Sequence, residues 1–402
     1  MATRGAGRMS GLAGRLLLFI GAALQLLLIT LVVGAYLPTI PYLGLFGMVA
    51  VSMLTPYLVL LLAIAGVVSG RRWRRGGGIG SAILTCATVL ALIGAAFVYV
   101  AMWRSARAAQ VSVDFGRTLI APVSFGNGAP PETARYDSYQ GEPLDLDIYR
   151  PIGRTSPKGA PVLIFIHGGG WISGTKRAAQ YDLRWFADHG WLVLSIEYTL
   201  SSQTRHLWAD TTPQIGCAMA WVAKQASRYG GDVSRLALAG DSAGGNLAIN
   251  ASYQANKGTL RSSCGGNIPR VLAVSAAYPV VDPANVYDNP DLLCGPSARN
   301  MALSYTGGTP RSVPERYAAI RSATHLSRMA PATLLVVSKV DHLVPPEPVH
   351  SLAAAARSAG VPAELIQLPY GDHSFASLPG AIGNQVYDKA TLRFIERYAA
   401  RR

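Results

Sequence analysis

Residues 235–246 have the sequence Arg-Leu-Ala-Leu-Ala-Gly-Asp-Ser-Ala-Gly-Gly-Asn, which is the most informative segment for predicting the fold. Its apolar first half is short enough for a buried strand, and the residues from Ala243 onward have the pattern of a helix. Gly240-Asp241-Ser242-Ala243-Gly244 therefore lies on a sharp strand-to-helix turn that exposes the Ser242 hydroxyl. Taken alone, in a chain with 42 glycines, the motif is a weak signal, and an ordinary glycine-rich turn is the alternative interpretation.

Short β-type runs alternate with longer amphipathic stretches on both sides of this turn. Such alternation predicts parallel βαβ units, and therefore an α/β fold with a doubly wound, mostly parallel sheet and helices on both faces. Residues 111–115 and 144–149 would be leading strands, which could run antiparallel. The later predicted strands are 162–166, 193–198, 235–239, 271–278, 333–338 and 363–368, and the predicted helices are 176–189, 213–229, the one opening at Ala243, 347–359 and 385–399.

Residues 279–331 interrupt this alternation with a segment rich in Pro, Asn, Asp and Gly. An irregular segment of about fifty residues inside a compact domain is usually functional. We expect it to form part of a cap over a site on the sheet.

Three long apolar stretches lie before residue 104, at 16–37, 42–69 and 79–103. Only 14% of the chain is charged and 50% is hydrophobic, and nearly all of the charge deficit falls in this region. Each stretch matches or exceeds the roughly 20 residues that span a hydrocarbon core, and a cleaved signal peptide would not be followed by two more. The sequence predicts a membrane region with three transmembrane helices at 1–104 and a catalytic domain at 105–402.

The arginines that flank these stretches predict an orientation. Three precede the first stretch and four lie between the second and third, whereas the link at 38–41 has no charge. Positively charged flanks favour the cytoplasmic side of a membrane. Three crossings then leave the later domain, joined by a polar neck at 105–110, on the extracytoplasmic side, although Arg104 and Arg107 count mildly against this.

The same arginines explain much of the formal net charge of +14. Clustered Lys and Arg can indicate nucleic-acid binding, but nine of the arginines flank the apolar stretches, so we expect no nucleic-acid partner. These nine are Arg4, Arg8, Arg15, Arg71, Arg72, Arg74, Arg75, Arg104 and Arg107.

The four cysteines have no C-x-x-C or Cys/His spacing, so no metal site is expected. Cys86, in the third apolar stretch, and Cys217, on a predicted helix, are expected to be free buried thiols. Cys264 and Cys294 lie in loop-like surroundings and could pair if the domain is extracytoplasmic.

His167-Gly168-Gly169-Gly170-Trp171 directly follows the predicted strand 162–166. Consecutive glycines let backbone N–H groups point into a cavity, where they stabilise charge that develops on a carbonyl oxygen. The expected donors are Gly169 and Gly170, joined by Ala243, near the positive end of its own helix. His167 is expected to be a structural residue of this loop.

A serine hydroxyl needs a general base near pH 7, and that imidazole needs a carboxylate to fix its tautomer. Asp341 follows the predicted strand 333–338, and His373 follows 363–368. Both would therefore emerge at the carboxyl ends of strands beside Ser242, where sites of open α/β sheets form.

Three neighbouring residues are weaker candidates for these roles. His342 adjoins Asp341, and Asp372 adjoins His373, so neither has the separate strand-end position that the chemistry needs. Asp241, inside the turn, is expected to be structural.

Together these segments resemble the hormone-sensitive-lipase-like and carboxylesterase branch of the α/β-hydrolase superfamily. The resemblance covers roughly residue 111 to the C-terminus, and the chain is also similar to membrane-anchored esterases of actinobacteria. It implies Ser242 as nucleophile, His373 as base and then acid, Asp341 as its orienter, an oxyanion hole of backbone N–H groups, and no cofactor. Residues 197–200, Glu-Tyr-Thr-Leu, depart from the Tyr-Arg-Leu type common in relatives. The segments that carry the resemblance are His167-Gly-Gly-Gly-Trp171, 230–246, Asp341-His-Leu-Val-Pro345 and Gly371-Asp-His373-Ser-Phe375.

These features predict a membrane-anchored serine carboxylesterase that hydrolyses short- or medium-chain esters through an acyl-enzyme. The same triad could serve an amidase, a formamidase or an acyltransferase, because water exclusion and leaving-group protonation decide among them. A non-catalytic ligand-binding role on this fold is a third reading. The expected partners are the bilayer and a small-molecule or lipid ester; the sequence does not reveal the acyl length or the oligomeric state.

Overall fold

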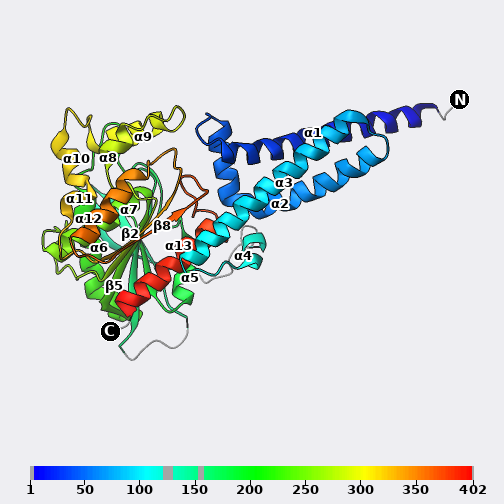
Figure 1. Ribbon diagram of the computed structural model, residues 1–402. Coiled ribbons are helices and arrows are strands. Elements are labelled where there is room, and N and C mark those ends of the chain that lie inside the picture. Colours follow the sequence, from blue (N-terminus) through cyan, green and yellow to red (C-terminus); the bar gives the residue numbers. More distant parts are fainter. Residues whose placement is uncertain (1–3, 121–129, 153–157, 401–402) are drawn as a thin grey trace. The chain divides into compact units, whose positions relative to one another are not determined.

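The computed structural model describes residues 4–120, 130–152 and 158–400, and the chain forms two compact units (Figure 1). Unit 1 contains the residues up to Arg104 together with Tyr370–Asp372. Unit 2 contains Ser105–Pro369 and His373–Arg402.

Unit 1 is built from three long helices, α1 (Arg4–Tyr36), α2 (Leu43–Arg74) and α3 (Gly78–Ala108). The last turn of α3 belongs to unit 2. All three are long and apolar enough to cross a membrane, in agreement with the predicted transmembrane region. Because α3 extends to Ala108, the predicted polar neck at 105–110 is mostly helical.

α1 and α2 pack closely because small residues face one another. A Cβ on Gly34 would lie 2.0 Å from the carbonyl oxygen of Leu43, and one on Gly47 would lie 2.4 Å from the carbonyl carbon of Gly34. Such close approach of small residues is a common way for membrane helices to associate.

Unit 2 contains an eight-stranded sheet in the order β1-β2-β4-β3-β5-β6-β7-β8. β1 and β2 pair antiparallel, β2 pairs antiparallel with β4, and the pairings from β4 through β8 are parallel. β3, β4 and β7 are almost entirely buried, as expected for strands covered on both faces. The strands are β1 (Glu132–Tyr139), β2 (Glu142–Tyr149), β3 (Ala160–Ile166), β4 (Leu192–Ile196), β5 (Gly231–Asp241), β6 (Ala273–Ala277), β7 (Ala332–Ser338) and β8 (Ala363–Leu368).

Helices form two groups around this sheet. α6 packs against α7, and α11 lies between α7 and α12, whereas α5 packs against α13. The predicted doubly wound, mostly parallel α/β architecture is therefore confirmed. The main helices are α5 (Gln180–Asp188), α6 (Thr211–Gln225), α7 (Ser242–Lys257), α12 (Glu347–Ser358) and α13 (Ile382–Ile395), with the short 3₁₀ helix η1 (Ala226–Tyr229) and the short π-helix η2 (Glu396–Ala400).

Two local predictions are wrong. Residues 111–115 form no strand, and Phe115 instead begins the short helix α4 (Phe115–Ile120). The leading strand is β1, which the sequence hides because this edge strand is mostly polar and pairs with only one neighbour. The predicted helix at 176–189 begins only at Gln180, because Lys176 and Arg177 lie in turns beside Asp147.

Residues 279–331 fold into four short helices: α8 (Pro283–Tyr287), α9 (Gly295–Thr306), α10 (Pro314–Ile320) and α11 (Ser322–His325). They are anchored to α7, because the side-chain amides of Asn246 and Asn250 donate to the carbonyl oxygen of Ile320 at 2.9 and 2.8 Å. The cap segment is thus tied to the helix that begins at Ser242.

A disulfide joins Cys217 on α6 to Cys264, with 5.4 Å between their Cα atoms. The expectation that Cys217 is a free thiol is therefore wrong, and Cys264 does not pair with Cys294. The chain after α7 returns across α6 so closely that a Cβ on Gly216 would lie 2.1 Å from the carbonyl oxygen of Arg261. This long-range approach has no signal in the local sequence.

Candidate active site

Ser242, His373 and Asp341 form one hydrogen-bonded chain at the carboxyl edge of the sheet. His373 Nε2 lies 2.9 Å from Ser242 Oγ, and His373 Nδ1 lies 2.8 Å from Asp341 Oδ2. The side chains of His373 and Asp341 are 11% and 3% exposed, and Ser242 is 7% exposed. With Nδ1 protonated toward the carboxylate, Nε2 can accept the serine proton.

The other carboxylate oxygen of Asp341 holds the side chain against the backbone turn that follows it. Oδ1 accepts from the backbone N–H groups of Leu343 at 3.0 Å and Val344 at 2.7 Å. Asn289 of the cap segment donates to the carbonyl oxygens of His342 and Leu343. Asn289 thus supports the acid turn, a role that no local motif indicated.

Aromatic rings hold the His373 imidazole. The ring centroid of Tyr278 lies 4.8 Å from that of His373 and 5.0 Å from that of Phe375, both in edge contacts. Burial raises the pKa of Tyr278 well above its usual value, so its phenol stays neutral. Tyr278 therefore positions the imidazole without adding charge.

Four non-glycine residues around the site have a positive φ: Trp171 (62°), Ser242 (51°), Tyr278 (36°) and Ser374 (64°). Side chains with a Cβ rarely adopt this region, and such strain concentrates at functional sites. The positive φ of Ser242 is consistent with the strained turn between β5 and α7 that the sequence predicted.

Gly244 lets that turn pack against the end of β3. A Cβ at this position would lie 2.1 Å from the carbonyl oxygen of Ile166. The parallel register, in which Ile166 pairs with Gly240, brings the loop after β3 and the turn after β5 to the same edge. The two glycine motifs are neighbours for this reason.

The loop after β3 presents two unused backbone donors. Gly169 has φ of 108° and accepts from the N–H groups of Ile172 and Ser173, which closes the loop on itself. Within the described part of the chain, the N–H groups of Gly169 and Gly170 donate no hydrogen bond. Ala243 lies in the first turn of α7, where N–H groups lack an intrahelical acceptor. These three groups can serve as donors to an oxyanion.

Asp241 binds this loop rather than the imidazole. Its Oδ1 accepts from the N–H of Gly168 at 2.9 Å. Burial raises the pKa of Asp241 to about 6, although the Gly168 N–H and the charge of His373 act in the opposite direction. The carboxyl therefore connects the two glycine motifs.

His167 and Tyr198 form the base of the loop. Their rings stack with 4.4 Å between centroids, and the Tyr198 hydroxyl donates to the carbonyl oxygen of His167 at 3.0 Å. Burial lowers the pKa of His167, and its Nδ1 donates to the carbonyl oxygen of Gly168. Glu197, beside Tyr198, binds Lys176 at 3.3 Å. Glu197 and Tyr198 thus support the loop.

The cap reaches the loop through α9. Trp171 is fully buried, and its ring stacks on Tyr305 with 4.4 Å between centroids. Met301 lies directly over Gly170, because a Cβ added to this glycine would be 2.5 Å from Met301 Sδ. Met301 and Tyr305 were not predicted as site residues, since their approach depends on how the cap folds.

One group of His, Cys, Asp or Glu side chains in the described residues is close enough to bind a metal: Asp137, Cys217 and Cys264. The two sulfur atoms are bonded to each other, so neither is available as a thiolate ligand.

A family model described as BD-FAE matches residues 146–355 of this chain. The chain is 30% identical over 249 residues to the probable carboxylic ester hydrolase LipM of Mycobacterium tuberculosis, covering 61% of this chain and 56% of that protein. It is 30% identical over 253 residues to esterase LipC of the same organism, covering 60% of each. Mouse (Mus musculus) hormone-sensitive lipase is 29% identical over 179 residues, which cover 40% of this chain and 22% of that protein. The matches thus span less than two thirds of these relatives.

Among solved structures, the chain is similar to the propionate-bound esterase Est2 of Thermogutta terrifontis. The TM-score is 0.54 at 22% identity, and the match covers 67% of this chain and 93% of that one. Esterase B of Lactobacillus rhamnosis gives a TM-score of 0.55 at 18% identity, covering 75% and 95%. These likenesses support the fold of unit 2.

Proposed function

The chain belongs to the BD-FAE family, in the hormone-sensitive-lipase-like and carboxylesterase branch of the α/β-hydrolases, and from this we propose that it is a membrane-anchored serine carboxylesterase. Its substrates would be short- or medium-chain carboxylic esters. The observation that carries the proposal is the continuous hydrogen-bonded chain from Ser242 Oγ through His373 to Asp341.

In the acylation step, His373 Nε2 accepts the Ser242 proton while Oγ attacks the ester carbonyl carbon. The N–H groups of Gly169, Gly170 and Ala243 stabilise the oxyanion, and Asp341 stabilises the imidazolium. His373 then gives its proton to the leaving alkoxide, which departs as an alcohol and leaves an acyl ester on Ser242.

In the deacylation step, the same imidazole removes a proton from water, which attacks the acyl carbon. The second tetrahedral intermediate collapses, the carboxylic acid leaves, and Ser242 Oγ regains its proton from His373. The cycle needs no cofactor, since proton transfer and oxyanion stabilisation come from this chain.

The Ser242→Ala variant tests this proposal directly. Turnover of p-nitrophenyl butyrate by the full-length protein should fall by about 10⁴-fold or more, because the nucleophile and its base act as a unit. Ser351→Ala, at an exposed serine on α12, should keep wild-type turnover. Retained turnover in Ser242→Ala would refute the assignment.

The alternative amidase, formamidase or acyltransferase activity uses the same triad. A matched ester and amide, each assayed with and without an added alcohol acceptor, distinguish these activities. Faster turnover of the amide, or predominant transfer to the alcohol, would replace the carboxylesterase proposal.

We place unit 2 on the extracytoplasmic side of the membrane. The arginines cluster before the first apolar stretch and between the second and third, which supports this side. The Cys217–Cys264 disulfide also supports it, because such bonds persist in oxidising compartments. Protease added to intact cells should digest unit 2, whereas digestion only after permeabilisation would contradict this orientation.

A further inference from the structure

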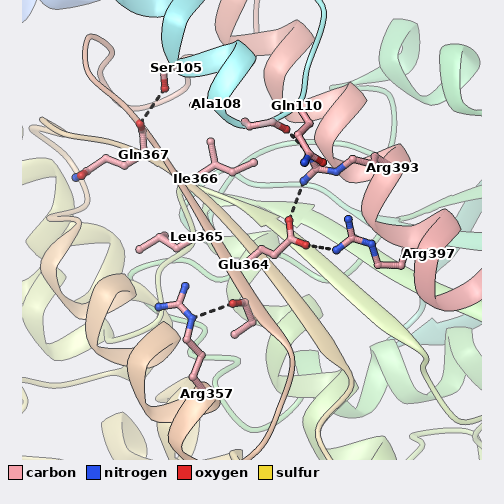
Figure 2. Close-up of a pocket in the computed structure, with 12 residues that line it drawn as sticks. Ser105, Ala108, Gln110, Arg357, Glu364, Leu365, Ile366, Gln367, Arg393 and Arg397 are labelled. Carbon is pink, nitrogen blue, oxygen red and sulfur yellow. Dashed lines mark hydrogen bonds and ion pairs between the residues drawn. The ribbon is translucent and has the colours of Figure 1, made fainter.

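A cleft of about 540 Å³ lies in unit 2, and no triad residue lines it (Figure 2). Its walls come from the last turn of α3 and the residues after it, from β8, and from α12, α13 and η2. The charged side chains in the lining are Arg357, Arg393, Arg397 and Glu364. Three arginines against one carboxylate give the cleft a surplus of positive charge.

The single acid does not occupy all of the arginine donors. Glu364 accepts from Arg393 at 2.7 Å and from Arg397 at 2.5 Å, using one nitrogen of each guanidinium (Figure 2). Arg357 uses only its Nε, on the carbonyl oxygen of Ala363 at 2.9 Å. An arginine has five N–H donors, so several remain for an anion.

One of these donors is buried. Arg393 also donates to the carbonyl oxygen of Ala109, but its Nε is shielded from solvent and has no hydrogen-bond partner in the described residues. A buried donor without a partner is costly, and this one belongs to a side chain that lines the cleft. Planar guanidinium groups suit phosphate oxygens especially well.

Chain connectivity gives the depth of the cleft in a membrane. α3 has 31 residues. A helix of that size is about 46 Å long, against roughly 30 Å of hydrocarbon, and its apolar stretch ends at Trp103, so its last turn can extend into the headgroup layer. Tyr99 and Trp103, aromatic residues of the kind found at membrane interfaces, lie in the turns just before Ser105. Ser105 lines the cleft and donates to the carbonyl oxygen of Gln367 at 3.2 Å.

We propose that this cleft binds the phosphate of an acidic phospholipid headgroup, held by Arg357, Arg393 and Arg397 at the end of the third transmembrane helix. Binding there would fix the end of α3 to β8 and α13 through the lipid. The site is separate from the triad, so it would influence stability in the membrane rather than the chemical step.

The test uses the full-length protein in non-ionic detergent micelles and measures its Tm. Added phosphatidylglycerol, at about a hundredfold over its Kd, should raise the Tm by roughly 3 to 8 °C, whereas phosphatidylcholine should not. The double variant Arg357→Gln/Arg397→Gln should lose most of this rise. Arg270→Gln/Arg311→Gln, with the same charge change at exposed positions outside the cleft, should keep it.

Three outcomes would overturn the proposal: no rise in the wild type, an equal rise in the cleft variant, or an equal rise with inorganic phosphate alone, which would assign the cleft to a soluble anion. If the double variant does not fold, Arg357→Gln alone should lose about half of the rise, because this exposed arginine binds only a backbone carbonyl. Turnover of a soluble ester should be unchanged in each folded cleft variant. The result is therefore independent of the proposed esterase function.

Discussion

The two units bury polar groups in different ways. In unit 1, Gln25 donates to Ser69 at 3.2 Å and to Thr88, a small neutral network between helices. Large apolar side chains stay exposed around it, with Phe19 74% and Ile79 81% exposed, as suits helices surrounded by lipid. In unit 2 the large apolar side chains form a core, and ionisable groups such as Asp341 are buried with specific partners.

The contrast explains why the candidate catalytic residues lie in unit 2. A dense core with fixed N–H groups can hold a carboxylate and an imidazole in one geometry, and losing a partner there leaves a buried group uncompensated. Between membrane helices a neutral hydrogen bond contributes less, because the separated helices find other partners. Removing buried polar groups should therefore have large effects in unit 2 and small effects in unit 1.

Among the substitutions that test this contrast, the largest expected effect is at the triad acid. Asp341→Asn should lower kcat by about 10³- to 10⁴-fold, because the amide no longer fixes the Nδ1 proton or stabilises the imidazolium. Ester turnover of the folded variant measures this. A drop of less than tenfold would show that the buried Asp341 carboxylate does not orient His373. It would also contradict the expectation that removing a buried polar group has a large effect in unit 2.

The disulfide gives the next largest effect. Cys217 and Cys264 are 47 residues apart, and a cross-link of that span contributes about 4 kcal/mol in the chain-entropy account. Cys217→Ser/Cys264→Ser should lower the Tm of unit 2, while Cys294→Ser, at a cysteine outside the disulfide, should not. If adding reductant left the Tm of the wild type unchanged, the bond would not stabilise the fold.

The carboxyl groups of Asp182 and Asp388 should make the free energy of unfolding depend on pH. Burial raises the pKa of Asp182 on α5 to about 6, and burial and Asp182 raise the pKa of Asp388 on α13 well above its usual value. Below pH about 4 both native and unfolded Asp182 are protonated. Between about 4 and 6 only the native state keeps the proton, so the free energy of unfolding falls as pH rises.

Asp182→Asn should remove that fall, on the order of 2 to 3 kcal/mol, and leave a flatter profile of unfolding free energy between pH 4 and 7. Urea unfolding at several pH values measures the profile, and Asp188→Asn, at an exposed aspartate of the same helix, is the control. An unchanged slope in Asp182→Asn would mean that Asp182 is ionised throughout.

The smallest effect should come from unit 1. Gln25→Leu removes the hydrogen bonds to Ser69 and Thr88, and should cost about 0.6 kcal/mol in unfolding by SDS titration in mixed micelles. Leu27→Val, at a lipid-exposed position of the same helix, is the matched control. A loss of about 2 to 3 kcal/mol in Gln25→Leu, the size of the pH-dependent change assigned to Asp182, would erase the distinction between the two units.

Local signals in the sequence were enough to predict the three long apolar helices, the parallel strands and the turn that carries Ser242. These features depend on local signals: apolar runs long enough to span lipid, buried β-type runs, and small residues around a strained turn. The order of strand ends also indicated His373 and Asp341, because parallel strands bring their carboxyl ends to one edge.

The contacts that join distant segments became visible only in the folded chain. It determined that Cys217 pairs with Cys264, that Asn289 supports the acid turn and that Met301 lies over Gly170. It also revealed the polar edge strand β1, which has no apolar run of its own. Such contacts follow from how the cap and loops pack in three dimensions, and residues brought together across long stretches of chain leave no period or spacing in the sequence.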